Sequence, residues 1–192
     1  MRDARESRLG VLLAAGEGKR FSGPVHKLLA PLKGSTVIDH SSRSLVEAGL
    51  DGAIAITGAA DVSAHLNGLL EVHNDDWSSG QRSSVVRAIT WARDNGYGAV
   101  VIGLADQPFV GADAWRAVAD CDSPVAVATY DGRRGNPVKL SEAVWDRFLS
   151  MESDPDRGAR AFIDLHPELV VQVACKGTSA DIDTEGDLSQ WT

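Results

Sequence analysis

The sequence predicts an α/β protein with a mostly parallel sheet, and three observations support that fold class. Short apolar runs of strand length alternate with longer segments whose apolar residues recur at helical spacing. The two most hydrophobic runs, 11–15 and 99–104, are bounded sharply enough to be strands buried on both faces. Gly16 follows the first run and Asp106 the second. Because ligands of such sheets bind at the carboxyl ends of strands, these two turns are the first candidates for a site.

The first two thirds of the chain continue this alternation. An extended piece at 28–32 follows the first strand, and Thr36 can cap a helix to about residue 48 that Gly49 ends. The elements expected after it are strand 53–57, helix 60–67, strand 70–73, helix 79–95, strand 99–104, helix 112–120 and strand 125–129. Right-handed crossovers join strands of this kind, so the sheet should be mostly parallel.

The last third is less regular. Gly132 and Pro137 favour a hairpin or a turn laid across the sheet over 130–140. Helices at 141–151 and 157–165 and a strand at 169–174 are expected to follow. Thr184 and Asp187 have the spacing of a capping pair for a short final helix.

Length and composition bound the kind of protein. The 192 residues, of which 43% are hydrophobic and 24% charged, suit one globular domain over 1–192, with 1–8 as a flexible N-terminal tail. A net charge of −8 argues against a nucleic-acid partner, which would require a basic face. The first apolar run is too short for a signal peptide or a membrane span, so we expect a cytoplasmic protein with no membrane partner.

The turn after the first strand has the residues of an anion site. Gly16 and Gly18 let backbone N–H groups approach a phosphate, and the nearby Lys19, Arg20 and Lys27 add positive charge. The turn is not a P-loop, because it has no glycine five residues before its Gly-Lys and no Ser or Thr after the lysine. A dinucleotide fingerprint lacks its third glycine, which weakens that reading without excluding it.

Two other segments could carry chemistry. Asp106 leaves a buried strand into a turn fixed by Pro108, and a carboxylate held so rigidly suits a Mg²⁺ ion that bridges phosphate oxygens. A capping role in the next turn explains Asp106 equally well. The serine-rich segment 74–85 leads from a strand into a helix, whose N-terminus can bind anions, although a plain serine N-cap also accounts for it.

Other reactive side chains show no pattern. Cys121 and Cys175 have no neighbours at metal-ligand spacing, so we expect buried or incidental thiols. The histidines also lack that spacing, and we expect them on the surface or in loops. No Gly-x-Ser-x-Gly occurs, which argues against a serine hydrolase.

The segment 13–27 resembles the signature of the MobA-like NTP transferase family, Leu-Ala-Ala-Gly-x-x-x-Arg-Met-Gly-x-x-Lys. Residues 13–16, Arg20 and Lys27 match it, with Phe21 in the methionine place. Arg20 and Lys27 are further apart than is usual in that family.

Later segments are similar to the same family in the same order. The run 104–108 resembles its Gly-Asp-Gln-Pro turn, with Ala105 in the glycine place. The segment 74–84 resembles an Asn-Pro-x-Trp-x-x-Gly-x-x-x-Ser segment of molybdenum cofactor cytidylyltransferases, with Asp75 in the proline place. The remaining matches are Gly-x-Pro at 135–137, Gly-Asp-x-Gly-Ala-Arg at 156–160, where Asp154 and Pro155 replace the Gly-Asp, and Asp-Ile-Asp-Thr at 181–184.

The resemblance implies a three-layer α/β/α sandwich of the nucleotide-diphospho-sugar transferase type, also called GT-A or SpsA-like. It implies a Mg²⁺-dependent nucleotidyltransferase that moves a nucleoside monophosphate to a phosphorylated acceptor and releases pyrophosphate. The implied catalytic residues are Arg20, Lys27 and Asp106, and the implied Mg²⁺ ligands are Asp106 and Asp183. The implied nucleotide-binding residues are Leu13, Ala14, Ala15, Gly16, Glu17, Gly18, Lys27, Gly80 and Ser84. The implied acceptor-binding residues are Asn136, Arg157 and Arg160.

Within the family, Ala15 resembles the cytidylyl-transferring members, and glycine at this place the guanylyl-transferring ones. CTP and a molybdopterin acceptor are therefore the expected substrates, with a molybdoenzyme as a recipient of the product. Two other functions stay open: an NAD(P)H-dependent oxidoreductase on the same scaffold, and a non-catalytic carrier of molybdenum cofactor.

Overall fold

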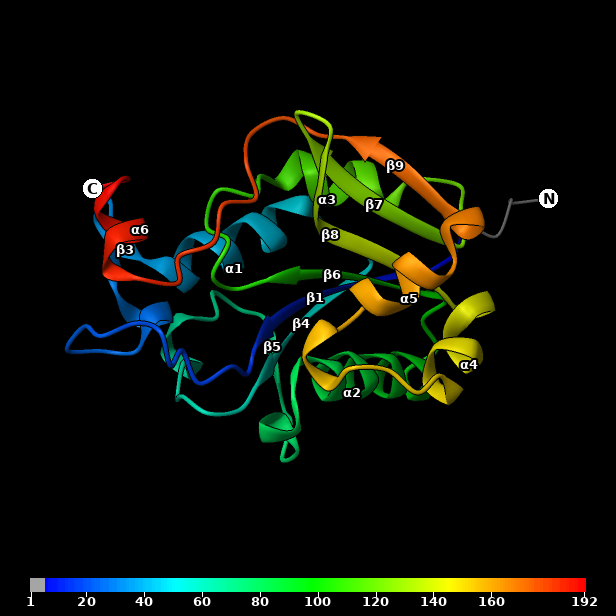
Figure 1. The fold of residues 1–192 in the computed structure, drawn as a ribbon, viewed down its shortest axis with the longest axis horizontal. Coiled ribbons are helices and arrows are strands. Elements are labelled where there is room, and N and C mark those ends of the chain that lie inside the picture. The colour runs from blue at the N-terminus through cyan, green and yellow to red at the C-terminus, as the bar shows by residue number, and fades with distance from the viewer. Residues whose placement is uncertain (1–5) are drawn as a thin grey trace.

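The centre of the molecule is a seven-stranded sheet, which the computed structural model describes within residues 6–192. In spatial order its strands are β5 (Leu70–His73), β4 (Gly52–Thr57), β1 (Arg8–Ala14), β6 (Ala99–Leu104), β8 (Arg133–Ser141), β7 (Val125–Tyr130) and β9 (Val170–Ala174). Every strand except β8 runs in the same direction. The predicted mostly parallel sheet is thus confirmed (Figure 1).

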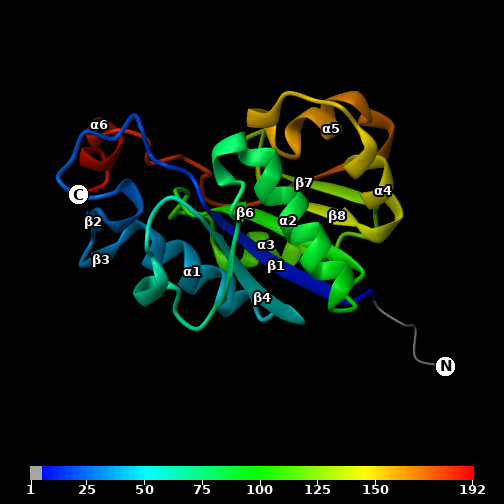
Figure 2. The same cartoon turned by 90° about the horizontal axis from the view of Figure 1, so that it is seen from below.

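Helices cover both faces of the sheet and make the three layers that the family resemblance implies (Figures 1 and 2). On one face lie α1 (Val37–Ala48) and α3 (Ala112–Ala119), and on the other α2 (Gln81–Asp94), α4 (Glu142–Ser150) and α5 (Arg160–Leu165). Alternation within β1 supplies both cores, because Leu12 faces α1 while Val11 and Leu13 face α2. A strand buried on both sides has to be apolar throughout, which is why 11–15 is apolar without a break.

Local signals placed several elements correctly. Strands 70–73 and 99–104 are observed at the expected bounds. Thr36 and Asp39 form a capping box at the start of α1, and Gly49 ends the helix with φ of 63°. Directly before α1, β2 (Pro31–Leu32) and β3 (Ser35–Thr36) form a small two-stranded sheet.

The expected helix at 60–67 is wrong, because only a 3-10 turn, Ser63–His65, forms there. Asn67 has a φ of 51°, which no α-helix accommodates. The segment is instead held by side chains of other elements, and the Ser42 hydroxyl of α1 donates to the His65 carbonyl at 3.0 Å.

The segment 130–140 was expected to form a hairpin or a turn laid across the sheet. It forms a hairpin, but the second strand of this hairpin is part of the main sheet. Asp131 and Gly132 both have positive φ, 49° and 77°, and turn the chain tightly. β8 then runs antiparallel between β6 and β7. Its buried Val138 and Leu140 continue the core of the α2 face.

Two helix starts and the tail also need correction. α2 begins at Gln81 with Gly80 as N-cap, so the expected serine cap is absent there. α5 begins at Arg160, because a 3-10 turn, Pro155–Arg157, precedes it. Arg8, expected in the tail, starts β1, and its backbone N–H donates to Asp51 at 2.8 Å. The tail residues 1–5 lie outside the described part of the chain.

The last element, α6 (Glu185–Ser189), carries the predicted capping box of Thr184 and Asp187. It lies at the end of the molecule where the loop after β1 also runs, and its Leu188 lines a cavity together with Pro31 of β2 (Figures 1 and 2). Among residues 6–192, none of the helices combines the length and apolarity that a membrane span requires.

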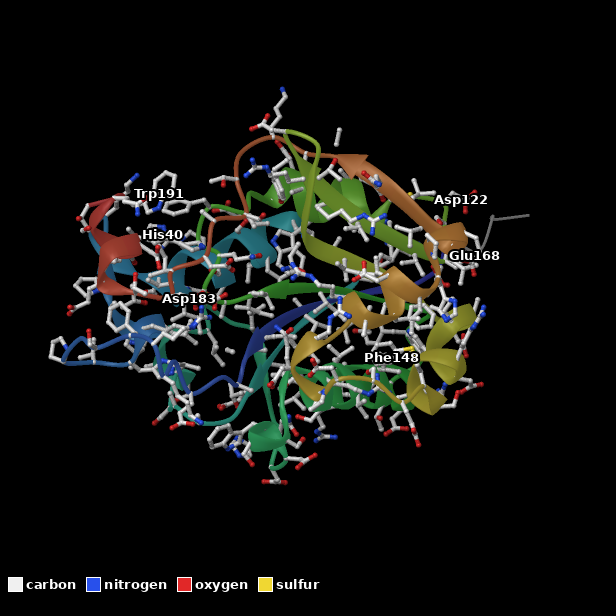
Figure 3. The ribbon with its side chains drawn as sticks, in the orientation of Figure 1. His40, Asp122, Phe148, Glu168, Asp183 and Trp191 are labelled. Carbon is white, nitrogen blue, oxygen red and sulfur yellow. The ribbon has the colours of Figure 1, made fainter. Side chains whose placement is uncertain are left out.

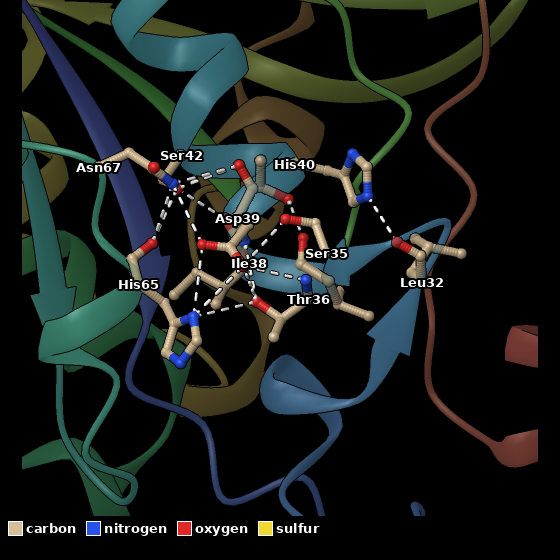
Figure 4. Close-up of polar contacts among 11 residues, drawn as sticks. Leu32, Ser35, Thr36, Ile38, Asp39, His40, Ser42, His65 and Asn67 are labelled. Carbon is tan, nitrogen blue, oxygen red and sulfur yellow. Dashed lines mark hydrogen bonds and ion pairs between the residues drawn. The ribbon is translucent and has the colours of Figure 1, made fainter.

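A polar network fixes the start of α1 (Figure 4). The carboxylate of Asp39 accepts hydrogen bonds from the Thr36 hydroxyl at 2.7 Å, from the Thr36 N–H at 3.0 Å and from the Ser35 hydroxyl at 3.2 Å. His65 Nδ1 lies 3.3 Å from the same carboxylate. Partial burial opposes ionisation of Asp39, but these hydrogen bonds outweigh it and lower its pKa to about 2.

Replacing Asp39 by Asn should therefore remove stability that depends on pH. A carboxyl group with a depressed pKa stabilises the fold above its unfolded pKa and loses that effect as the pH falls toward the folded value. We expect D39N to lower the free energy of unfolding by about 2 kcal/mol near pH 6, and by roughly half as much at pH 3. Urea denaturation across this range measures it, with D146N as control because Asp146 is 91% exposed. An equal loss at both pH values would contradict the assignment.

Candidate active site

A cavity of about 400 Å³ opens where β1 and β6 end side by side. All of the residues predicted to be catalytic or to bind nucleotide or metal line it, namely Leu13, Ala14, Ala15, Gly16, Glu17, Gly18, Arg20, Lys27, Gly80, Ser84, Asp106 and Asp183. Segments far apart in the sequence meet here, because parallel neighbours end at the same edge of the sheet. Figure 3 shows Asp183 on the C-terminal segment close to this edge.

The glycine loop after β1 is hydrogen-bonded to a histidine. His26 Nδ1 accepts a hydrogen bond from the Leu28 N–H at 3.3 Å, so the proton lies on Nε2, which donates to the Gly16 carbonyl at 3.1 Å. Gly18 has a φ of 69°, and a Cβ there would lie 3.1 Å from His26 Nε2. The sequence placed His26 among surface and loop residues and missed this contact.

Lys27 lies at the bottom of the cavity despite its longer separation from Arg20. Its Nζ is 2.5 Å from Asp106 Oδ2 and 2.8 Å from Asp183 Oδ1, and only 11% of its side chain is exposed. Burial opposes the charge on Lys27, but the attraction of both carboxylates outweighs it and raises the pKa of Lys27. Arg20, 74% exposed, reaches Asp183 Oδ2 at 2.9 Å.

The turn that carries Asp106 is fixed by bonds from two other elements. The buried Ser41 hydroxyl of α1 donates to the Ala105 carbonyl at 2.8 Å, and the Ile182 N–H donates to the Asp106 carbonyl at 2.8 Å. The second carboxylate oxygen, Asp106 Oδ1, is buried and has no hydrogen-bond partner. A buried carboxylate oxygen without a partner is costly, and a cation bound there would satisfy it.

The carboxylates of Asp106 and Asp183 fit a divalent ion shared with a phosphate ligand. Both contact the same lysine nitrogen, so they lie within the span of one cation. Within the described residues no cluster of three or more His, Cys, Asp or Glu side chains could hold a metal by itself. Mg²⁺ sites of this composition use one or two carboxylates and take their other oxygens from phosphate and water.

A second cavity, of about 360 Å³, adjoins the first and contains the predicted acceptor residues Asn136, Arg157 and Arg160. Its apolar lining comes mostly from strands and from the covering helices, and includes Leu13, Val85, Ile102, Leu104, Val127, Val138 and Ile163. Arg157 is paired with Asp164 at 2.6 Å. Arg134 lies 3.6 Å from the same carboxylate, so part of the positive charge is already matched.

Gln107 connects the wall of this second cavity to the aspartates near Lys27. Its side-chain amide is buried, donates to Asp181 Oδ1 at 2.8 Å and accepts from Asn136 Nδ2 at 3.1 Å. Desolvation of the Asp181 carboxylate, together with the negative charges of Asp106 and Asp183, raises its pKa. Neither Gln107 nor Asp181 was predicted as a site residue, although both stand beside predicted aspartates.

The start of α2 forms the wall between the cavities. A Cβ on Gly80 would lie 2.7 Å from the Pro155 carbonyl, so glycine lets this segment cross the helix start. Ser84 is buried beneath the wall, where Asn74 Nδ2 donates to its hydroxyl at 3.1 Å. Leu13, Leu104, Gln81 and Asp156 line both cavities, which therefore meet over the ends of β1 and β6.

The fold is that of a nucleotidyltransferase. A family model described as the MobA-like NTP transferase domain matches residues 10–171, and the chain belongs to that family. Members of the family usually depend on a divalent metal, and one solved structure similar to this chain is a complex of Rv0371c from Mycobacterium tuberculosis with manganese, 25% identical with a TM-score of 0.79.

Several individual proteins are similar over nearly the whole chain. Nicotine blue oxidoreductase of Paenarthrobacter nicotinovorans is 31% identical over 91% of both chains. The purine catabolism protein PucB of Bacillus subtilis is 28% identical over 92% of this chain and 91% of its own. A nucleotidyl transferase from Methanothermobacter thermautotroptrophicus is 25% identical, with a TM-score of 0.80 over 96% of this chain and 95% of its own.

Replacing Gly18 by Ala should loosen the loop and weaken nucleotide binding. The new Cβ would be strained at a φ of 69° and would crowd both His26 and the stem of Lys27 at 3.2 Å. We expect affinity for a nucleoside triphosphate to fall roughly tenfold by calorimetry, a loss of about 1.4 kcal/mol. G34A is the matched control, because Gly34 has a φ of 82° with nothing within 4 Å of its Cβ position. An equal loss of affinity in G18A and G34A would contradict a specific role for the packing of Gly18 against His26 and Lys27.

Proposed function

We propose that the protein transfers CMP from CTP to the phosphate of molybdopterin or molybdenum cofactor, with Mg²⁺ as cofactor and pyrophosphate as the leaving group. One observation supports this most directly: the glycine loop after β1 and the carboxylates of Asp106 and Asp183 line a single cavity, and an arginine-walled cavity adjoins it. A triphosphate needs backbone donors and cations, and its metal ion needs oxygen ligands.

In this proposal, residues 14–18 hold the triphosphate through backbone N–H groups. Arg20 and Lys27 offset the charge that develops on the phosphates, and Asp106 and Asp183 hold Mg²⁺, which would supply further charge neutralisation when bound. Ser41 of α1 positions Asp106 by fixing the carbonyl of the preceding Ala105. The protein contributes mainly position and charge, which is what phosphoryl chemistry requires.

The second cavity supports a flat acceptor that carries a phosphate. The apolar side chains at the ends of β1 and β6 suit a ring system, and Asn136, Arg157 and Arg160 offer donors around it. Because Leu13 and Leu104 line both cavities, an acceptor phosphate placed here would lie next to the nucleotide. Molybdopterin has this combination of a ring system and a phosphate.

The choice of CTP rests on the family motif, in which Ala15 resembles the cytidylyl-transferring members. A molybdoenzyme that takes over the product is part of the same proposal. We also infer that residues 1–192 act as one nucleotidyltransferase domain and that the protein works in the cytoplasm.

Similarity to a protein named nicotine blue oxidoreductase makes an NAD(P)H-dependent reaction the second candidate. The geometry favours it less. In a dinucleotide-binding fold the first glycine turn leads directly into a helix whose N-terminus receives the pyrophosphate. Here residues 15–26 are irregular, only a 3-10 turn, Lys27–Leu29, follows, and α1 starts at Val37. The carrier function would use the second cavity alone.

Pyrophosphate release tests the proposal against both alternatives. CTP with Mg²⁺ and molybdenum cofactor should yield pyrophosphate faster than GTP, ATP or UTP. D106N should reduce the rate of pyrophosphate release by roughly a hundredfold or more, since the proposed Mg²⁺ site loses a charged ligand. D122N is the control, because Asp122 is exposed at the opposite end of the molecule (Figure 3).

Two outcomes would contradict the proposal: no pyrophosphate from any of the four nucleotides, or normal turnover by D106N. Binding of NADPH with D106N fully active would favour the oxidoreductase. Cofactor binding with no pyrophosphate release would favour the carrier.

A further inference from the structure

The cation position between Asp106 and Asp183 is taken by a side chain of the protein itself. Lys27 Nζ is within hydrogen-bond distance of one oxygen of each carboxylate, at 2.5 and 2.8 Å. Arg20 occupies the other oxygen of Asp183 at 2.9 Å. Two carboxylates and two cations cancel, so this cluster is neutral without any metal ion.

A divalent ion cannot simply be added to such a cluster. It would bring two further positive charges next to Lys27, whose side chain is only 11% exposed, and repulsion at such short distances is strong where water is largely excluded. Asp106 Oδ1 is free, but both oxygens of Asp183 are taken, one by Lys27 and the other by Arg20. An ion that contacted both carboxylates would therefore lie against the Lys27 ammonium, which has to move away first.

We propose that Lys27 is a built-in competitor that keeps divalent metal out of the site until a nucleotide draws its ammonium away. This inference rests on the proposed function, because it takes Asp106 and Asp183 as the metal ligands.

The structure offers the ammonium a second place within the same cavity. The stem of Lys27 packs along the glycine loop, and a Cβ on Gly18 would lie only 3.2 Å from Lys27 Cγ. A triphosphate held by that loop would present negative oxygens beside the stem, and rotation of the flexible side chain would bring Nζ to them. Nucleotide would then release the metal site, and by linkage metal would tighten nucleotide binding.

Lys19 provides a matched comparison for the charge effect. It lines the same cavity, but its side chain is 78% exposed and pairs with Glu17 at 3.1 Å. Removing Lys19 takes one positive charge from the cavity without freeing either metal carboxylate.

Mn²⁺ binding, followed by the electron paramagnetic resonance signal of the free ion, tests the competition directly. Without nucleotide, K27M should bind Mn²⁺ about tenfold or more tightly than the wild-type chain, whereas K27R and K19M should stay near wild type. Adding a non-hydrolysable CTP analogue should tighten Mn²⁺ binding by the wild type more than by K27M. K27M binding no tighter than wild type, or K19M tightening equally, would overturn the inference.

Further variants separate this inference from the proposed function. The melting temperature of K27M should fall without Mn²⁺ and recover with it, and K27Q serves for the same measurements if K27M does not fold. The double variant K27M/D106N should lose the tight binding. If D106N weakens Mn²⁺ binding but K27M does not strengthen it, the competition is wrong while the metal site stands. If K27M/D106N binds as tightly as K27M, the site itself is misplaced and both ideas fail.

Discussion

The ion cluster of Lys27, Asp106 and Asp183 is the interaction on which the arrangement of the site depends. It joins residues that are 79 and 156 positions apart along the chain. They come from the loop after β1, the turn after β6 and the segment before α6. Each charge is partly buried, so each needs the others, and loss of one partner would leave an uncompensated charge. The cluster therefore ties three otherwise irregular segments into one corner.

The sheet makes this corner possible by bringing the ends of β1 and β6 together. These strands are parallel neighbours, and the residues of their last register pair, Leu13 and Leu104, line both cavities. α1 fixes the turn that carries Asp106, because the Ser41 hydroxyl donates a hydrogen bond to the Ala105 carbonyl. Group transfer between two bound molecules depends on such placement, because held reactants avoid the entropy of meeting in solution. The irregular loops carry the charged side chains of the site, and the packed strands hold those loops in place.

The sequence predicted those strands and helices whose formation depends on residues close together in the chain. The strand at 99–104 follows from its unbroken apolar run. The helix α1 follows from its capping residues. The helix expected at 60–67 failed because side chains of α1 hold that segment in another form. The insertion of β8 could not be predicted, since its neighbours in the sheet are decided by packing rather than by the turn.

In the candidate site, the glycine loop and Asp106 were predicted from their places after strands, and both line one cavity. His26 and Gln107 were missed because their roles lie in single contacts with Gly16 and Asp181.

Anomalous scattering from crystals grown with Mn²⁺ and a non-hydrolysable CTP analogue would locate the metal ion, the phosphates and Lys27 in one experiment. We expect one strong manganese peak contacting the Asp106 and Asp183 carboxylates and the phosphates, with Lys27 Nζ moved onto the phosphates. Nucleotide bound in the cavity with manganese elsewhere, or with Lys27 still between the two carboxylates, would contradict it.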